Sequence, residues 1–339
     1  MKKPVFIILL LINTGFLYAQ IGGKRVFEFL NMPTNARTAA LGGVVVSATD
    51  NDATMFLSNP ALLNSENHNY LSVSYMGFYA DIQYSSFTYT RKFTKFGIMG
   101  FGVQRMGYGE FESYDASGNS IGKFEAGETA VTVSNSYKVG PFSMGVNLKF
   151  VQSSIYTYSA SGLFLDLGGV YRHPEKELSI ALNMKSLGVL LSDYTDSSNG
   201  TLPFDVQAGV TFKPEHMPFR FTFTAYNLNR DNVAYFDENL NGQEDQPGQV
   251  DKIFRHINIG TELILGKNFN VRVGYNHLLR KELRLTNTSG GAGFNFGFMV
   301  RIKAFELAYT NATYHASGGR SFLTITSNLN RILKKKTIE

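Results

Sequence analysis

The chain has 339 residues, no cysteine, a formal net charge of +5 and an aromatic content of 14%. Without cysteine it has no disulfide framework, thiolate zinc site, cysteine nucleophile or lipid-modified cysteine. Its only basic run, Lys334 to Lys336, does not indicate nucleic-acid binding, so no nucleic-acid partner is expected. The 28 Phe, 18 Tyr and 33 Gly favour strands and turns over helices.

Residues 1–19 have the pattern of an export signal peptide. Two lysines precede the apolar run Val5 to Ile12, and Leu17-Tyr18-Ala19 offers a cleavage site before Gln20. The alternative is a membrane anchor, but this run is far shorter than the about 20 residues that cross a bilayer core. Removal of the signal leaves 30 basic and 27 acidic side chains, a net charge of +3.

No later stretch is apolar for long enough to predict a transmembrane helix. From Asn69 onward the chain instead breaks into short runs in which apolar and polar residues alternate, the period of a strand with two different faces. In the run Phe142 to Phe150, every second residue is large and apolar. The predicted strands are 70–78, 81–92, 95–107, 127–138, 142–154, 161–172, 176–184, 204–213, 218–228, 254–265, 268–278, 291–301, 303–311 and 320–329.

The connections between these runs alternate in length. Short links follow the even-numbered runs, and most odd-numbered runs are followed by long segments, as in barrels with short periplasmic turns and longer outer loops. The link at Tyr79-Ala80 is the short exception. The predicted outer loops are 108–126, 185–203, 229–253, 279–290 and 312–319.

These patterns predict an all-β fold, a 14-stranded antiparallel transmembrane β-barrel over residues 69–330 in the outer membrane. Its apolar rows would face lipid, while Lys149, Arg220 and Arg272 would point into the lumen. The alternative is a soluble stack of sheets or a propeller, because alternation alone does not distinguish a lipid-facing row from a core-facing one.

The segment before the first strand is different. Residues 20–68 do not alternate, and they hold Pro33, Gly42-Gly43 and Pro60 among short apolar clusters. They are too apolar for a free tail, so we predict an N-terminal plug in the lumen or at the periplasmic mouth. Residues 331–339 are predicted to form a basic C-terminal tail.

The sequence does not indicate an enzyme. Gly118 to Gly122 has the spelling of a nucleophile elbow, but Asp115 to Asn119 has the residues of a tight hairpin turn, which is the preferred interpretation. The six histidines are scattered without the spacing of a zinc site. We therefore expect no catalytic residues and no cofactor.

One acidic stretch, residues 237–248, partly matches a calcium loop. It has oxygen donors at positions 1, 3, 5 and 9 and glycine at position 6, but Gly248 stands where a bidentate Glu belongs. We interpret it first as an acidic outer loop and, as the alternative, as a weak calcium site. The ligands would then be Asp237, Asn239, Asn241 and Asp245.

Two motifs, Phe29 to Gly43 and Leu57 to Leu63, resemble the start of the PorV/PorQ family. This family comprises FadL-like outer-membrane barrels of the type IX secretion system of Bacteroidetes. The continuation through Tyr79 to Ile82 is most similar to the PorQ branch. The residues that carry the resemblance are Ala36, Arg37, Leu41, Gly42, Gly43, Asn59, Pro60 and Ala61.

The resemblance implies a 14-stranded barrel that anchors a partner at the cell surface. PorQ-like members are associated with PorZ, a component of the attachment complex that processes cargo and links it to lipopolysaccharide. The peptidase activity of that complex belongs to another subunit. PorV-like members instead shuttle cargo by its C-terminal domain.

Two functions remain open as hypotheses. In the first, loops 229–253 and 185–203 dock a PorZ-like surface protein while the plug blocks the lumen. In the second, the chain is a FadL-like passive transporter of hydrophobic molecules, in which the plug lines a path and a kinked strand opens towards the bilayer. The residue pattern favours neither, and the resemblance favours the anchor.

Overall fold

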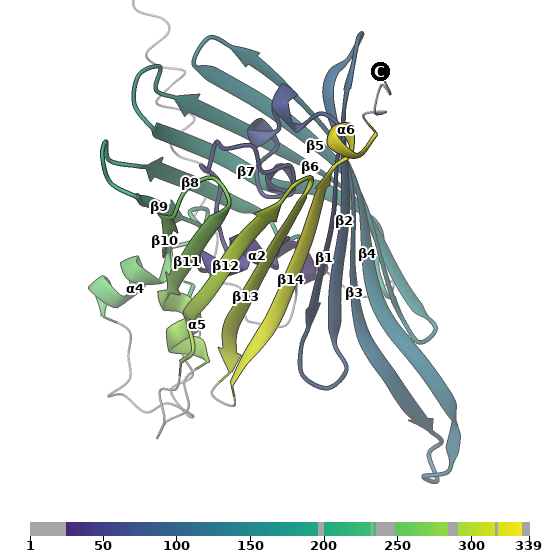
Figure 1. Ribbon diagram of the computed structural model, residues 1–339. Helices are drawn as coiled ribbons and strands as arrows, with labels where there is room; N and C mark the ends of the chain where they lie inside the picture. The colour runs from purple at the N-terminus through teal and green to yellow at the C-terminus, as the bar shows by residue number, and fades with distance from the viewer. Residues whose placement is uncertain are drawn as a thin grey trace, which may run out of the picture.

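The computed structural model describes residues 25–195, 200–231, 233–234, 248–283, 291–315 and 318–333. Within these residues, fourteen strands form one closed antiparallel barrel in which sequential strands pair and β1 pairs with β14 (Figure 1). The strands are β1 (Tyr70–Gly77), β2 (Gln83–Phe93), β3 (Gly97–Tyr114), β4 (Ser120–Val139), β5 (Phe142–Ile155), β6 (Tyr158–Arg172), β7 (Leu178–Ser192), β8 (Asp205–Phe212), β9 (Phe219–Ala225), β10 (Ile257–Ile264), β11 (Phe269–Asn276), β12 (Phe294–Ile302), β13 (Phe305–His315) and β14 (Gly318–Asn328).

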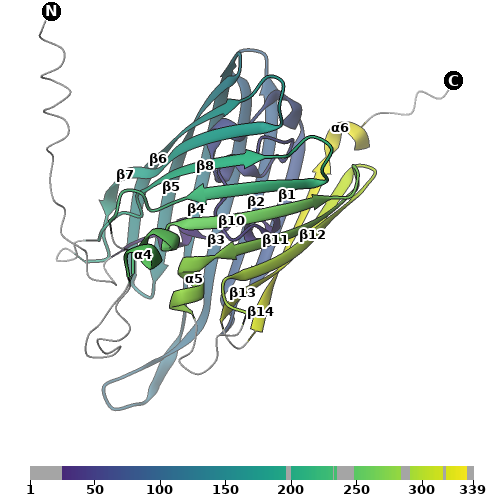
Figure 2. The same ribbon diagram turned by 90° about the vertical axis from the view of Figure 1, so that its left-hand side faces the viewer.

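The two ends of the barrel differ. The terminal end holds the start of β1, the end of β14 and helix α6 (Leu329–Ile332), together with short turns. The loop end holds the β3–β4 hairpin and helices α4 (Gln249–Arg255) and α5 (His277–Glu282) (Figure 2). Because outer-membrane barrels keep their short turns in the periplasm, the loop end corresponds to the outer side.

The fourteen predicted strands and their antiparallel closure are confirmed. The alternation also has the predicted direction. Along β5, Met144 is exposed on the outside, whereas Asn147 and Lys149 are buried on the inside. Arg220 and Arg272 also point inward, where they contact acidic side chains. An apolar outside and a polar inside are what a lipid-facing wall requires.

Two of the predicted outer loops need correction, because 108–126 is largely strand and β7 extends into 185–203 as far as Ser192. The register shifts after Gly107 in β3, and β7 has a second shift beside Ser186. Each shift is a β-bulge, and the extra residue reverses which side chains face the lumen. The alternating pattern is therefore interrupted although the strand continues.

Smaller corrections concern strand ends. The predicted loop 312–319 is mostly strand, since β13 runs to His315 and β14 begins at Gly318. Conversely, positions 254–255 and 277–278, predicted as strand, are helical in α4 and α5.

Several expectations fall on residues that the structure does not describe. The export signal at 1–19 and the acidic stretch at 237–247 lie outside the described residues. Of the predicted basic tail, 334–339 also lie outside, and 331–333 form the end and the C-cap of α6.

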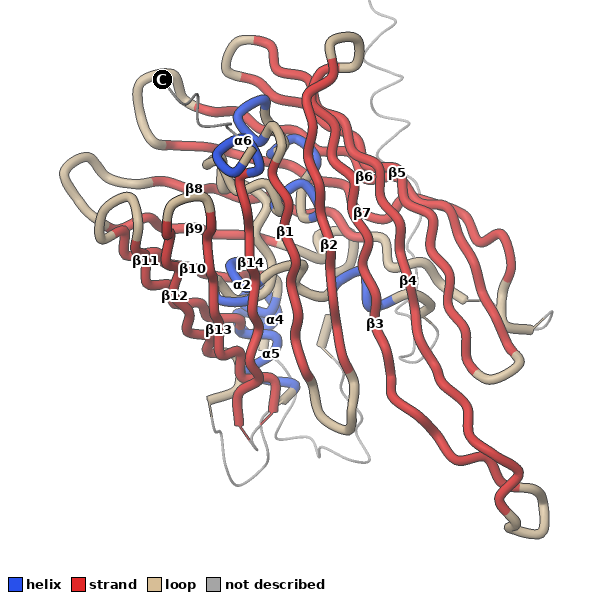
Figure 3. Tube along the Cα trace, turned by 45° about the vertical axis from the view of Figure 1, so that its right-hand side comes forward, coloured by secondary structure: helices blue, strands red, loops and turns tan. Residues whose placement is uncertain are grey.

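Residues 25–68, hereafter the plug, lie inside the barrel and run from the loop end to the terminal end (Figures 1 and 3). At the loop end Arg25 pairs with Thr201. Near the terminal end the Thr90 hydroxyl of β2 donates to the Asn67 carbonyl. The plug contains η1 (Glu28–Asn31), α2 (Ala36–Ala40), η2 (Met55–Leu57), η3 (Pro60–Leu62) and η4 (Ser65–Asn67).

Candidate functional site

Two asparagines determine the local structure of the plug. The side chain of Asn35 accepts a hydrogen bond from the Thr38 N–H at 2.8 Å and so caps α2. Asn59 caps η3 by accepting from the Ala61 N–H at 3.0 Å, and Pro60 takes the first helical position, where its missing N–H is not needed. The Asn59-Pro60-Ala61 motif therefore forms a capped turn.

The barrel wall has glycines where the plug comes closest. A Cβ added to Gly145 would lie 2.3 Å from the carbonyl carbon of Pro60, and one added to Gly274 would lie 2.2 Å from the nitrogen of Gly42. Only glycine allows backbones to approach so closely, so both motifs rest on glycines of the wall. The other wall glycines against plug atoms are Gly100, Gly102, Gly168, Gly209, Gly260 and Gly297.

Two asparagines of the wall hold the turn that follows α2. In this turn Gly42 and Gly43 have φ angles of +95° and +103°, which L side chains rarely adopt. Asn258 of β10 donates to the Leu41 carbonyl at 2.8 Å, and Asn276 of β11 donates to the Gly42 carbonyl at 3.0 Å. The glycine pair thus turns the chain so that two strands can bind its carbonyls.

Two further asparagines hold the second motif. Asn147 of β5 donates to the Phe56 carbonyl at 2.9 Å, and Asn183 of β7 donates to the Ser58 carbonyl at 3.0 Å. These carbonyls belong to plug residues that are buried from water, so each would otherwise lack a partner.

Arg37 of α2 is buried at the centre of a charged network. Its Nη1 lies 2.6 Å from Asp50 Oδ1 and 3.3 Å from Asp52 Oδ2, both in the plug, and its Nη2 lies 2.8 Å from Glu262 Oε2 of β10. Burial alone would lower the pKa of Arg37, but the Asp50 and Glu262 carboxylates raise it well above its ordinary value. Arg37 is therefore charged, and it joins the plug to the wall.

The neighbouring strands complete this network. Arg220 of β9 lies 2.8 Å from Asp50 and 3.1 Å from Glu262, and Arg272 of β11 lies 3.0 Å from Glu262. The network thus contains three guanidinium groups and three carboxylates, so its net charge is zero. Its members are Arg37, Arg220, Arg272, Asp50, Asp52 and Glu262. Removing one partner of a buried ion pair typically costs about 3–5 kcal/mol, because a charge is left uncompensated.

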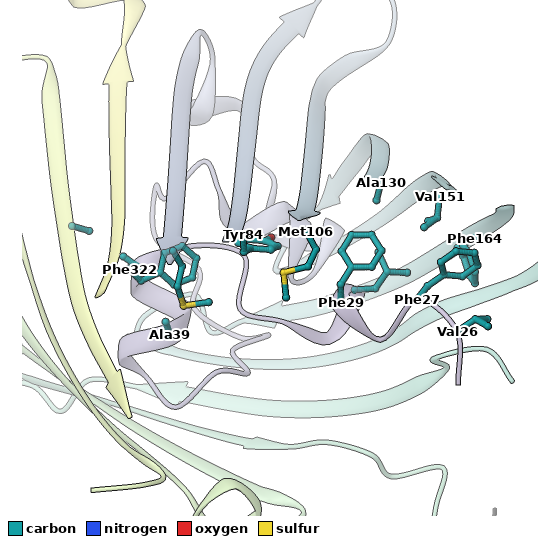
Figure 4. Close-up of a cluster of buried hydrophobic side chains, with 14 of the residues drawn as sticks. Val26, Phe27, Phe29, Ala39, Tyr84, Met106, Ala130, Val151, Phe164 and Phe322 are labelled. Carbon is teal, nitrogen blue, oxygen red and sulfur yellow. The ribbon is translucent and has the colours of Figure 1, made fainter. Parts of the chain in front are cut away.

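A hydrophobic cluster joins the plug to the opposite part of the wall. Figure 4 shows Phe27 beside Phe164 of β6, and their rings meet edge to face at 5.7 Å. Phe29 packs in the same cluster, which also holds Tyr84 of β2 and Phe322 of β14. The plug is therefore held by apolar contacts towards β2, β6 and β14 and by the charged network towards β9, β10 and β11, with asparagine hydrogen bonds from both parts of the wall.

A second buried ion pair lies within the wall. Lys149 Nζ lies 2.5 Å from Asp166 Oδ2, and Asp166 also accepts from the Ser186 N–H at 2.9 Å. Ser186 has a φ of +59° at the bulge of β7. The carboxylate thus fixes this bulge, and the adjacent Lys185 faces the lumen.

A cavity of about 570 Å³ remains between the plug and the wall, towards the loop end. Of residues 47–68 only Ser58 lines it, so η2, η3 and η4 take no part. Val44 to Val46, Leu278 and Leu279 give it an apolar side. Its charged lining residues are Arg25, Glu28, Lys185, Asp205, Arg230 and Glu282. Such a mixed lining suits an amphipathic ligand or a polar chain segment.

The structure brings the motif residues of the sequence together inside the barrel. Seven of the eight are buried, and Gly43 is half-buried. Sequence reasoning missed Glu262 and the wall asparagines, although polar residues at the inward positions of alternating runs were a usable signal. The candidate calcium ligands Asp237, Asn239, Asn241 and Asp245 lie outside the described residues.

The described ranges hold neither a metal-ion cluster nor a helix that could span a membrane. They contain no group of three or more His, Asp or Glu side chains placed to hold a metal ion. No helix in these ranges is both long and apolar enough to cross a membrane.

Comparison with known proteins identifies the fold. No family model matches the sequence, and no curated protein matches it. The deltaS2 mutant of TodX, described as a monoaromatic hydrocarbon channel, is similar with a TM-score of 0.52 and 13% identity, over 88% of this chain and 97% of that chain. A Pseudomonas aeruginosa FadL homologue has a TM-score of 0.48 and 11% identity, over 87% and 98% of the two chains. The chain therefore has the fold of the FadL-like outer-membrane barrels.

Proposed function

We propose that this barrel anchors a protein at the outer face of the membrane, as the resemblance to the PorV/PorQ family implies. Its place would be the attachment complex of the type IX secretion system, and its surface partner would be a PorZ-like protein. The observation that carries the proposal is an extension of β3 and β4 beyond the rim of the barrel, here called the arm (Tyr108–Ala126). Figures 1 and 3 show the arm projecting past the other strands at the loop end.

The two faces of the arm differ in chemistry. On one face Phe111 and Phe124 stack at 5.4 Å, and Phe124 meets Tyr156 of the β5–β6 turn at 5.1 Å. On the other face Lys123 lies 2.6 Å from Glu110. Exposed aromatic side chains are enriched in protein–protein contacts, where a few residues contribute most of the binding energy.

The packing of the plug supports an anchoring function over the passage of a molecule through the lumen. The plug backbone is seated on Gly145 and Gly274 of the wall, and the buried charged network at Arg37 joins the plug to β10. Opening a path through this contact would separate buried ions and amides from their partners, which is unfavourable. No catalytic function is proposed, since the sequence offers no paired base and nucleophile.

The second candidate function is passive transport of a hydrophobic molecule. The cavity beside Val44 to Val46 favours it, and the similar TodX structure is described as a monoaromatic hydrocarbon channel. A third possibility, taken from the resemblance, is a PorV-like cargo shuttle. The three functions predict different molecules bound to the purified barrel.

The test is purification of the tagged barrel from its own outer membrane in mild detergent, with mass spectrometry of bound proteins and extracted lipids. An anchor yields one stoichiometric surface protein, a shuttle yields mixed cargo, and a transporter yields a small apolar molecule without a protein. The Phe111→Ser/Phe124→Ser variant should release the partner, because it removes the aromatic face of the arm.

The matched control changes the opposite face of the same hairpin. The Glu110→Ser/Lys123→Ser variant removes an exposed ion pair of little energetic value and should retain the partner. A barrel that carries only apolar ligand, with or without the arm substitutions, would overturn the anchoring function.

A further inference from the structure

Helix α4 (Gln249–Arg255) at the loop end exposes its apolar side. Val250, Ile253 and Phe254 are 67%, 61% and 46% exposed, whereas Arg255 is only 8% exposed. A helix on the surface of a soluble protein normally does the reverse, with its apolar stripe packed inward. This orientation therefore calls for an apolar or interfacial environment around α4.

Polar contacts fix this orientation. Asp251 accepts hydrogen bonds from Arg255 Nε at 2.7 Å and pairs with His277 Nε2 of α5 at 2.8 Å, and Lys281 Nζ lies 3.3 Å away. Burial alone would raise the pKa of Asp251, but the hydrogen bonds from His277 and Arg255 lower it to about 2. The charged side of α4 is thus held against α5, and its apolar side must point away from the barrel.

The apolar side of α4 continues the outer surface of the wall. The Phe254 ring meets His277 at 6.0 Å, and His277 Nδ1 lies 2.9 Å from the Tyr275 hydroxyl. Tyr275 packs on Phe294 of β12 at 4.8 Å. The side chains of Arg272 and Asn276 in β11 point into the lumen, where they bind Glu262 and the Gly42 carbonyl. Tyr275 has the opposite parity along the strand, so its ring lies on the lipid side of β11.

Aromatic rows at the ends of barrel strands mark the boundary between lipid and water. Phe254 is the last member of a chain of ring contacts that begins at Phe294 and Tyr275 on the lipid-facing wall. The charge of the two helices also suits this boundary, because α4 and α5 together hold four Lys or Arg and two Asp or Glu, a net charge of +2 with neutral histidine. Cationic side chains beside an apolar face favour anionic head groups.

We propose that α4 lies in the head-group region of the outer leaflet, with Val250, Ile253 and Phe254 inserted among the lipids. The occupant of this surface is thus the bilayer and not a protein. The inference depends on the barrel fold and its lipid-facing wall, and it does not depend on the anchoring function. It adds a lateral contact with lipid that positions the loop end relative to the membrane surface.

The chain has no tryptophan, so a single introduced tryptophan is a specific probe. The full-length barrel would be reconstituted into phospholipid vesicles, and tryptophan emission would be measured with ordinary and with brominated acyl chains, which quench on contact. Ile253→Trp should emit at shorter wavelength than a tryptophan in water and should be quenched. Val250→Trp, on the same face, serves as the second variant should the first fold poorly.

Two controls bracket the result. Ile121→Trp replaces the same residue type at similar exposure, 57% against 61%, but on the projecting arm, and it should stay in water and unquenched. Leu148→Trp lies on the lipid-facing wall of β5 and should be quenched. Two outcomes overturn the proposal: emission like that of Ile121→Trp, or blue-shifted emission without quenching, which would mean that protein covers the helix.

Discussion

The plug meets the barrel wall by different means on its two sides. Towards β2, β6 and β14, Phe27 and Phe29 pack into an apolar cluster (Figure 4). Towards β9, β10 and β11, Arg37 enters the charged network and the turn at Gly42 is bound by wall asparagines. Apolar contacts are strong but have little directional preference, whereas ion pairs and amide hydrogen bonds require a fixed geometry.

This difference indicates a division of roles. The apolar side contributes burial that any well-packed arrangement would provide, and the polar side selects one position of the plug. The wall glycines add a steric condition, because the backbone of the plug fits only where no Cβ intervenes. The plug is thus expected to behave as a fixed part of the barrel, held by three kinds of contact that can be broken separately.

The largest effect is expected from the steric contact. In Gly145→Ala the new Cβ would lie 2.3 Å from the backbone of Pro60. The motif Leu57 to Leu63 then cannot keep its position against β5, and the plug should move away from the wall. Because the chain has no cysteine, a Ser47→Cys background gives one buried thiol whose labelling rate reports plug opening. Labelling should approach the rate of an unprotected thiol.

The control for this substitution lies on the neighbouring strand. Gly169 of β6 pairs with Met144, beside Gly145, but a Cβ there would meet nothing within 4 Å. Gly169→Ala should therefore leave labelling slow. Equal rates in the two variants would show that the plug does not rest on Gly145.

The next effect compares the two sides of the plug directly. Glu262→Gln is nearly isosteric but leaves Arg37, Arg220 and Arg272 with one carboxylate fewer, which should destabilise docking by about 3–5 kcal/mol. Phe27→Ala should cost a similar amount, about 3–5 kcal/mol, through lost packing. Labelling of the Ser47→Cys thiol measures both free energies of opening.

The two variants should differ in what restores docking. A second substitution that removes a positive charge, Arg272→Gln, should recover part of the loss in Glu262→Gln, because it relieves an unpaired guanidinium. The same substitution should add to the loss in Phe27→Ala, which lies in a different cluster. If Arg272→Gln has the same effect in both backgrounds, the charged network does not act as a unit.

Much of the barrel could be predicted from the sequence, because period-2 alternation reports directly which residues face lipid. The bulges at Gly107 and Ser186 could not, since one extra residue reverses the alternation and imitates the end of a strand. Helices α4 and α5 were missed because each is short and adjoins a strand, so its residues were divided between a predicted outer loop (249–253, 279–282) and a predicted strand (254–255, 277–278).

The contacts between the plug and the wall could not be predicted from the sequence, for another reason. Arg37 and Glu262 are 225 positions apart, and nothing in either segment indicates how far the plug enters the lumen. The glycines were a weaker but real signal. Gly145 and Gly274 stand at inward positions of otherwise good strands, where a missing side chain suggests that another backbone comes close.

The smallest effect is expected from pH. Burial alone would raise the pKa of Asp50, but the guanidinium groups of Arg37 and Arg220 lower it well below its ordinary value. A carboxyl whose pKa is lower in the docked state contributes stability above its ordinary pKa of about 3.9, and that contribution is lost only as the pH falls towards the lowered value. The free energy of plug docking should therefore stay constant from neutral pH down to about pH 5, which is roughly one unit above the ordinary pKa of an aspartate.

Labelling of the Ser47→Cys thiol over this pH range, corrected for the ionisation of the thiol itself, measures the effect. Asp50→Asn should mimic protonation at every pH and speed labelling, because Arg37 and Arg220 lose a shared carboxylate. A plug that opens between pH 7 and about pH 5 in the unsubstituted network would mean that Asp50 titrates in its ordinary range and that the guanidinium groups do not hold it. The charged network would then be a set of solvated pairs, and the apolar cluster at Phe27, the wall asparagines and the wall glycines would keep the plug in place.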